Sequence, residues 1–376
     1  MGVYEKKRDS TSIIIIMKRI SQWVLAAMLT MMGVSPLSAQ GNDKEPDLQA
    51  LYQEIDDAIE HSPQYIAHRL GQIDDLHKLL LDESSLEKRL TLAERLFALY
   101  KPYKNDSALY FADLCVALAD SLQQKNKVGL YLSLKAHQCS TVGMYVESLD
   151  LLKRIDKQSL EREGLTKYYA AWMHVCGEIG AYSQLEDERL KYFALQDGYR
   201  DSVLAVAEEG SEEYLHLKMD VLCARQQYQD ALTVSDKWFG KVSNGTHEYA
   251  YAAFYRSVVY DKLGNKSQLR YWLGKSALDD IKCAVNDQAS LFMLSERLCE
   301  DGDYNRAYRY VRFCENCNTV FSPQLRNYQV RYVANVMEAS YQNSEARYSR
   351  LLMMACAVGL LLLGLVIWLL IKKGKK

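Results

Sequence analysis

Residues 298–314 read LCEDGDYNRAYRYVRFC, and this stretch decides the fold. Gly302 interrupts one helical pattern, and Tyr304, Ala307 and Val311 follow it at the three- and four-residue steps of a second helix. Glycine suits a tight connection because it tolerates backbone angles that other residues avoid. The stretch therefore predicts two antiparallel helices, with a small residue where they touch and large apolar residues between them.

The same frame recurs towards the N-terminus. The positions equivalent to 304 are 266, 228, 182 and 145, so the intervals in chain order are 37, 46, 38 and 38 residues. This near-regular spacing is typical of tetratricopeptide repeats, which are helical hairpins of about 34 residues that stack on one another. We expect a loop insertion in the one long interval, near residues 195–213.

The repeats, together with two amphipathic pairs before them, predict an all-α fold. We expect a tetratricopeptide-like α-solenoid of stacked helical hairpins over residues 47–320, with one C-terminal transmembrane helix. Ser62 and Pro63 form a helix-start signal, and Asp106 or Ser107 is expected to cap a later helix. An ordinary helical bundle is the alternative.

The C-terminal end carries an apolar run. Residues 351–371 contain no charge over 21 positions, which as a helix span about 31 Å, against a hydrocarbon core of about 30 Å. Four lysines in the tail at 372–376 outnumber the two arginines before the span, which places the C-terminus in the cytoplasm. Residues 323–350 predict a continuous juxtamembrane helix, and Ala355 with Gly359 would permit a homodimer through the membrane helix.

The N-terminal end resembles a leader. Residues 1–39 contain a positive start and an apolar run too short to span a membrane, and Ala39 is the expected cleavage position. Met17 is the more plausible initiator, and an uncleaved anchor is the alternative. Together the two ends predict a single-pass protein of the inner (cytoplasmic) membrane, with the bulk of the chain in the periplasm.

The charge of the exported body excludes one class of partner. The chain has a net charge of −2, residues 1–39 carry +3 and residues 346–376 carry +6, which leaves −11 for residues 40–345. An acidic body of this kind argues against nucleic acid, whose phosphates require lysine and arginine.

With these features in place, the chain resembles a group of membrane-anchored tetratricopeptide-repeat proteins of unknown function that are common in Bacteroidetes, some of them labelled regulators. The stretches that carry the resemblance are 64–80, 106–114, 143–152, 301–314 and the terminal apolar helix. It implies an exported repeat domain in a signalling or regulatory setting and supplies no catalytic residues. Members of the group usually continue into a long cytoplasmic helical segment, whereas this sequence ends at Lys376, which implies a truncated member or a separate signalling chain.

Cys314 and Cys317 form the sharpest local motif. A redox pair needs a helix N-terminus and a zinc site needs two further ligands, and the sequence offers neither nearby. The pair is expected just past the end of a helix, either as a local disulfide or as unpaired packing thiols. Cys139 and Cys176 share one repeat position and are expected to be small core residues.

No constellation of residues points to catalysis. The seven histidines are dispersed, and adjacent carboxylates such as Glu212 and Glu213 are interpreted as solvated surface. We therefore predict no catalytic residues, no cofactor, no metal and no enzymatic activity.

Tyrosine is the abundant aromatic residue, with 27 copies against eight phenylalanines. In stacked hairpins the first helices line the concave surface, where tyrosine offers apolar area with one hydrogen-bonding tip. The candidate groove residues are Tyr168, Tyr169, Tyr251, Tyr255 and Arg256, and packing between helices is the alternative. The sequence thus predicts a binding and signalling module for a protein, peptide or glycan, with a structural scaffold of the envelope as the alternative.

Overall fold

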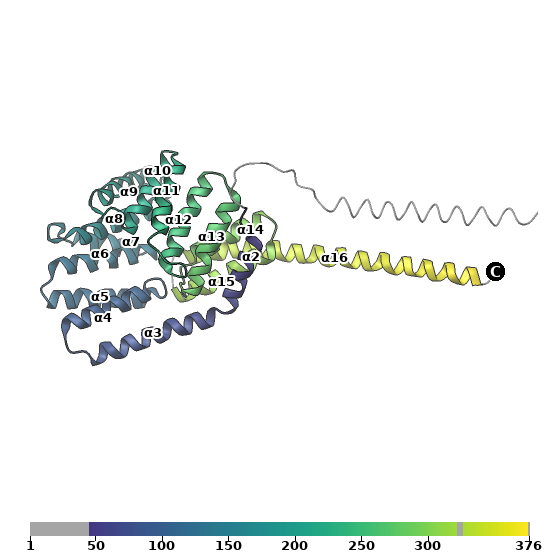
Figure 1. The fold of residues 1–376 in the computed structure, drawn as a ribbon, viewed down its shortest axis with the longest axis horizontal. Helices are drawn as coiled ribbons and strands as arrows, with labels where there is room; N and C mark the ends of the chain where they lie inside the picture. The colour runs from purple at the N-terminus through teal and green to yellow at the C-terminus, as the bar shows by residue number, and fades with distance from the viewer. Residues whose placement is uncertain (1–44, 322–325, 375–376) are drawn as a thin grey trace, which may run out of the picture. The chain divides into compact units, whose positions relative to one another are not determined.

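The computed structural model describes residues 45–321 and 326–374, and the predicted leader at 1–39 lies outside them. Over the described residues every regular element is a helix, which confirms the all-α prediction (Figure 1). The helices are α2 (Leu48–Glu60), α3 (Ser62–Asp82), α4 (Leu86–Tyr100), α5 (Asn105–Ser121), α6 (Lys125–Thr141), α7 (Tyr145–Lys153), η1 (Lys157–Ser159), α8 (Arg162–Tyr182), α9 (Glu186–Val206), α10 (Glu212–Ala224), α11 (Tyr228–Phe239), α12 (His247–Lys262), α13 (Lys266–Lys282), α14 (Ala289–Glu300), α15 (Tyr304–Phe321) and α16 (Arg326–Gly374).

Consecutive helices pack as antiparallel hairpins, and each hairpin stacks on the next, as predicted. We use "first helices" for the leading members of the hairpins, namely α4, α6, α8, α10, α12 and α14, and "second helices" for α5, α7, α9, α11, α13 and α15. Four of the five predicted repeat anchors, at 145, 228, 266 and 304, are the first residues of second helices.

Local signals set the hairpin turns. Gly143, Gly264 and Gly302 each precede a second helix with φ of 90°, 70° and 85°, a left-handed conformation that favours glycine. The Pro63 signal is confirmed in the first turn of α3. The predicted cap at Asp106 or Ser107 is wrong by a few residues, because α5 already begins at Asn105.

Gly180 differs from the turn glycines, although its repeat position is equivalent. It lies inside α8, which continues to Tyr182. A Cβ atom at Gly180 would come within 2.9 Å of the Phe193 ring on α9. This glycine therefore permits close helix packing, and the second helix of this hairpin begins at Glu186, later than predicted.

The long interval contains no inserted loop. Residues 195–206 belong to α9, which extends over 21 residues, and only residues 207–211 connect it to α10. The prediction of a loop insertion is therefore wrong: a longer second helix accounts for most of the additional residues.

The array is held together by buried side chains between the helices. Small residues lie where helices approach closely. Cys139 and Cys176 are at most 1% exposed, as predicted. Ser148 and Ala307, each three residues after the first residue of a second helix, are also fully buried. Close packing of this kind leaves little room for larger residues.

Helix α2 packs against the last hairpins. Leu51, Tyr52 and Ile55 of α2 share one buried cluster with residues of α13, α14 and α15, such as Leu273 and Tyr310. A stack of hairpins alone would contact its neighbours in sequence only. The contact between α2 and α13–α15 therefore closes the two ends of the array on each other.

Polar contacts reinforce this closure. The Arg69 guanidinium donates to the main-chain oxygens of Leu99 and Cys283, at 2.5 Å and 2.6 Å. The buried Asn286 amide donates to the Tyr103 main-chain oxygen at 2.7 Å. Arg69 of α3 thus bridges the ends of α4 and α13, and Asn286 joins the turn after α13 to the turn after α4.

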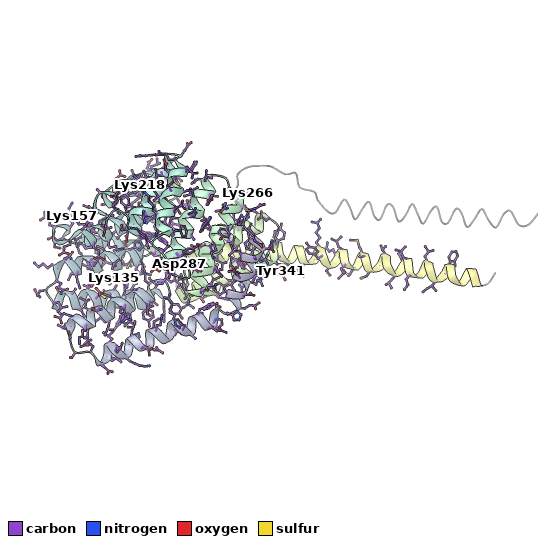
Figure 2. The ribbon with its side chains drawn as sticks, in the orientation of Figure 1. Lys135, Lys157, Lys218, Lys266, Asp287 and Tyr341 are labelled. Carbon is purple, nitrogen blue, oxygen red and sulfur yellow. The ribbon has the colours of Figure 1, made fainter. Side chains whose placement is uncertain are left out.

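Helix α16 begins at Arg326 and continues to Gly374 without a break. Its stretch Glu345–Leu365 is long and apolar enough to cross a membrane, and its side chains are not buried in the protein. At the other end, Ala334 belongs to the same buried cluster as α2 and α15, and the Tyr341 ring stacks on Tyr308 of α15 at 5.0 Å (Figure 2).

Candidate functional site

Two of the predicted groove residues, Tyr251 and Tyr255 on α12, form an aromatic group with two side chains of the preceding hairpin. Their hydroxyls lie 3.3 Å apart. The buried His216 ring lies 4.9 Å from Tyr255 and 5.9 Å from Tyr251, and Trp238 lies 5.8 Å from each. Burial raises the pKa of both phenols, so they remain protonated hydrogen-bonding groups.

Tyr168 and Tyr169 on α8 join a different aromatic group. Tyr168 contacts Trp172 at 6.4 Å, and Tyr169 contacts Tyr199 of α9 at the same distance. Trp172 and Tyr199 stack at 5.3 Å. The structure therefore does not bring these tyrosines together with Tyr251 and Tyr255.

Arg256 faces the second helices. Its guanidinium donates to Asp236 on α11 at 2.6 Å and lies over the Trp272 ring of α13, 4.7 Å from its centre. This side chain is engaged between α11 and α13, so it packs helices together at this position.

A polar group lies on the first helices. We call it the inner cluster, and it consists of Lys101, His137, Lys167, Glu212, Glu213 and His247. Lys101 ends α4, His137 lies on α6 and Lys167 on α8. The two glutamates open α10 and His247 opens α12. Four consecutive first helices and the end of a fifth therefore carry these side chains.

Direct contacts join parts of the inner cluster. Lys167 forms an ion pair with Glu213, and His247 lies 2.8 Å from a carboxylate oxygen of Asp280 on α13. The rings of His137 and His174 lie 4.2 Å apart. These contacts connect α6 to α8, α8 to α10, and α12 to α13.

Lys101 and Glu212 are the unpaired charges of the cluster. Both side chains are exposed to water. Yet burial and the charge of Lys167 lower the pKa of Lys101, and burial and the charge of Glu213 raise the pKa of Glu212. The charge of each also acts on the pKa of the other.

The histidines of this region differ in protonation. Burial and His174 lower the pKa of His137 well below its usual value, and burial lowers the pKa of His216 to about 4. Burial also disfavours the charged form of His247, but the hydrogen bond and charge of Asp280 outweigh it and raise its pKa. His137 and His216 are therefore neutral at pH 7.

Cys314 and Cys317 lie inside α15, which continues to Phe321, so the prediction that they follow the end of a helix is wrong. Both are buried free thiols. Burial raises the pKa of Cys317 to about 12 and that of Cys314 well above its usual value. Thiols with such pKa values are poor nucleophiles at neutral pH.

The described part of the chain contains no candidate metal site. No three histidine, cysteine, aspartate or glutamate side chains gather there in an arrangement that could hold an ion.

Sequence reasoning missed most of the inner cluster. Glu212 and Glu213 were expected to be solvated surface, whereas Glu213 is paired with Lys167 and its side chain is only 20% exposed. Lys101 and His137 carry no local signal, because they belong to separate repeats. The position of these residues on first helices is the one cue in the sequence.

A search of the curated proteins finds no match. Among solved structures, a crystal structure of a Rap protein complexed with competence and sporulation factor is similar, with 13% identity, a TM-score of 0.45, and coverage of 80% of this chain and 88% of that one. This likeness is too distant to inform function.

A family model gives the stronger result. The model of the SusR N-terminal TPR domain matches residues 59–332, from the end of α2 to the first part of α16. The match covers well over half of the chain and includes every hairpin described above. The protein therefore belongs to the family of the SusR N-terminal TPR domain.

Proposed function

We propose that the protein is a non-enzymatic binding and signalling module whose inner cluster and Tyr251 face a partner. The observation that carries the proposal is the set of polar side chains on consecutive first helices: Lys167 of α8 pairs with Glu213 of α10, while the exposed side chains of Lys101 and Glu212 have no direct partner in the described part of the chain. Exposed charges that have no partner within the chain are free to pair with charges of a binding partner. Repeat arrays use such concave faces to bind proteins, peptides or glycans.

The proposal includes a membrane anchor at α16. Leu351, Leu361 and Leu365 are half or more exposed, which in water would leave a large apolar surface uncovered. A lipid bilayer covers such a surface, and the lysines after it favour a cytoplasmic C-terminus. The helical array would then lie in the periplasm of a cell with an inner membrane.

Membrane extraction tests the anchor. The full chain should remain in the membrane fraction after a carbonate wash, and Leu361→Arg should shift it towards the soluble fraction, because a charge at the centre of the span is expensive. Glu345→Arg, at the edge of the apolar stretch, is the matched control. Release of the unchanged chain by carbonate would contradict the anchor.

Signalling is favoured over a plain scaffold by one contact. Ala334 of α16 is buried in the same cluster that holds α2 against α15. A ligand that changes the packing of α2 against α15 would therefore act directly on the N-terminal part of α16. A scaffold of the cell envelope remains the second candidate function, since it needs the same docking face.

A pull-down tests the binding function. The full chain, solubilised in detergent, should capture a partner from an envelope extract, and Lys101→Glu should reduce the capture strongly. Lys157→Glu, which changes an exposed lysine on η1 outside the inner cluster, should leave the capture unchanged (Figure 2). Capture that Lys101→Glu does not alter would contradict a role for this face.

A further inference from the structure

We propose that α2 exchanges between two copies of this chain, so that the groove on α13–α15 of each copy holds the α2 helix of the other. The interaction surface is this groove, and the partner that fits it is a second copy. The inference goes beyond the proposed function, because it depends neither on the inner cluster nor on its ligand.

Helix α2 belongs by packing to one part of the molecule and by its chain connection to another. Its buried residues Leu51, Tyr52 and Ile55 share a cluster with residues of α13, α14 and α15. The buried apolar residues of α3, by contrast, share a cluster with residues of α4, α5 and α6. Only His61 separates α2 from α3 in sequence. The boundary between the two clusters therefore falls at this one residue, and rotation there moves α2 without disturbing the buried core of α3.

The groove matches α2 in shape. Gly274 of α13 has no side chain, and a Cβ atom there would lie 2.7 Å from the Cδ2 atom of Leu51. The Leu51 side chain therefore occupies a space that only glycine leaves free. On α15, the buried Tyr310 hydroxyl donates a hydrogen bond of 3.2 Å to the main-chain oxygen of Tyr52. An amphipathic helix whose apolar face lies in such a groove is a recurring mode of protein recognition.

The groove also matches α2 in charge. Asp56 of α2 pairs with the guanidinium of Arg309 at 2.7 Å and with that of Arg306 at 3.3 Å. The Arg306 guanidinium also lies 5.3 Å from the centre of the Tyr52 ring. The Asp56 side chain is 15% exposed, so this carboxylate between two arginines is largely shielded from water. A helix without an acid at this position would leave both arginines without this partner, which favours α2 over an unrelated helix.

A second copy of the chain supplies the same helix on the same hinge. Each contact described above then forms between two copies as it does within one, and the exchange is reciprocal, as a two-fold symmetric dimer requires. Exchange of an identical element is a low-cost route to a dimer, because both arrangements bury the same surface. A short connecting segment such as His61 favours this route.

The other closure contacts remain within each copy. Arg69 of α3 donates to the main-chain oxygen of Cys283, and Asn286 donates to that of Tyr103. These bonds hold α3 and the turn after α4 on the end of α13, and they do not involve α2. Exchange therefore requires only that α2 leave its groove. Because Ala334 of α16 belongs to the cluster that includes α2, each α16 would then share its buried cluster with the α2 of the other copy.

A charge-reversal pair tests the exchange. Two full chains with different affinity tags are prepared in detergent: one carries Asp56→Arg, and the other carries Arg306→Asp together with Arg309→Asp. Within either variant α2 meets a groove of like charge, whereas in a mixed dimer each α2 meets a groove of opposite charge. We expect the mixture to give about tenfold or more two-tag dimer than either variant mixed with a differently tagged copy of itself. Asp57→Arg, at an exposed neighbouring carboxylate, replaces Asp56→Arg in the matched control and should give no such gain.

A covalent lock tests the exchange without a change of charge. Oxidation of Leu51→Cys/Gly274→Cys at high dilution should join the two close positions and tie α2 to its own groove. Unchanged chains with two different tags should co-purify after mixing in detergent, and locked chains should not. The same double variant after reduction is the matched control and should co-purify again.

Absence of a two-tag dimer in the charge-reversal mixture would overturn the inference. A variant that unfolds alone should regain its helical circular dichroism in the mixture, and failure to regain it counts against the exchange. Co-purification that survives the lock would overturn the inference and assign the dimer to another surface, and no co-purification of unchanged chains at any concentration would overturn it as well. In an envelope extract, a disulfide from position 274 of the reduced double variant to a foreign protein, with none to position 51 of a second copy, would assign the groove to a foreign helix instead.

Discussion

The Tyr310 hydroxyl on α15 donates a hydrogen bond of 3.2 Å to the main-chain oxygen of Tyr52 on α2, across 258 residues of sequence. Both tyrosines are buried. Asp56, one turn further along α2, accepts from Arg306 at 3.3 Å and pairs with Arg309 at 2.7 Å. These contacts hold α2 against α15 of the last hairpin, next to the N-terminal part of α16.

Asp56→Ala should loosen this closure. The change removes the carboxylate between two arginines, and we expect a loss of about 1–2 kcal/mol, discounted because Arg309 is half exposed. Hydrogen exchange followed by mass spectrometry should show faster exchange in α2 and α15. Asp57→Ala changes the neighbouring exposed carboxylate and should have no such effect. Equal exchange in the two variants would show that the Asp56 pairs contribute nothing.

A pair of glycines tests the packing of α8 on α9. Gly180→Ala should lower the free energy of unfolding by about 1–2 kcal/mol, because its Cβ atom would collide with the Phe193 ring. Gly198→Ala, within α9, meets nothing within 4 Å and should raise it by about 0.5–1 kcal/mol through helix propensity. Urea unfolding measures both, and a stabilising Gly180→Ala would contradict the close contact.

His216 should make the protein less stable in acid. Its folded pKa of about 4 lies below the usual 6.5, so between these values the unfolded chain binds a proton that the folded chain does not. Stability is therefore unaffected above about pH 6.5 and falls by up to about 3 kcal/mol as the pH drops to 4. His216→Phe keeps a ring in place and removes this titration. Urea unfolding of the two proteins at pH 7 and pH 4 should show different pH dependences, and parallel curves would contradict the burial of this histidine.

Asp220 should act in the opposite direction. Burial raises its pKa to about 6, so the folded chain binds a proton more tightly than the unfolded chain and the carboxylate destabilises the fold as the pH rises through 6. Asp220→Asn should therefore raise the free energy of unfolding at pH 7 by about 1–3 kcal/mol, with a smaller gain at pH 4. Asp201→Asn, at a side chain that is 75% exposed, is the control and should change little. A destabilising Asp220→Asn would show that the charged carboxylate is stabilised in the fold.

Local chemistry made much of the fold predictable. Gly302 and Gly264 mark their turns because the left-handed conformation is a property of the residue itself. Gly180 looked the same in sequence, but its role depends on Phe193 of the next helix. The register of that hairpin and the helical nature of residues 195–206 could not be read from the repeat spacing alone.

Contacts distant in sequence were beyond prediction. Leu51 and Tyr52 have the pattern of any amphipathic helix, and nothing in it indicates that Gly274 of α13 leaves room for Leu51, whose Cδ2 atom would lie 2.7 Å from a Cβ there. The candidate site follows the same rule. Tyr251 and Tyr255 stand out because tyrosine is abundant, whereas Lys101 and Glu212 lie on helices far apart in sequence and have no distinctive local pattern.

Photo-crosslinking tests the closure of the two ends of the array most directly. A benzoyl-phenylalanine in place of Ile59, which packs against the shared cluster of α2 and α13–α15, should crosslink to peptides within residues 266–321 when the full chain is irradiated in detergent. The same group in place of Leu79, an exposed residue near the end of α3, is the control and should not reach those peptides. Crosslinks from position 59 that stay within α2–α4, with none to residues 266–321, would show that the array is open and would contradict the account.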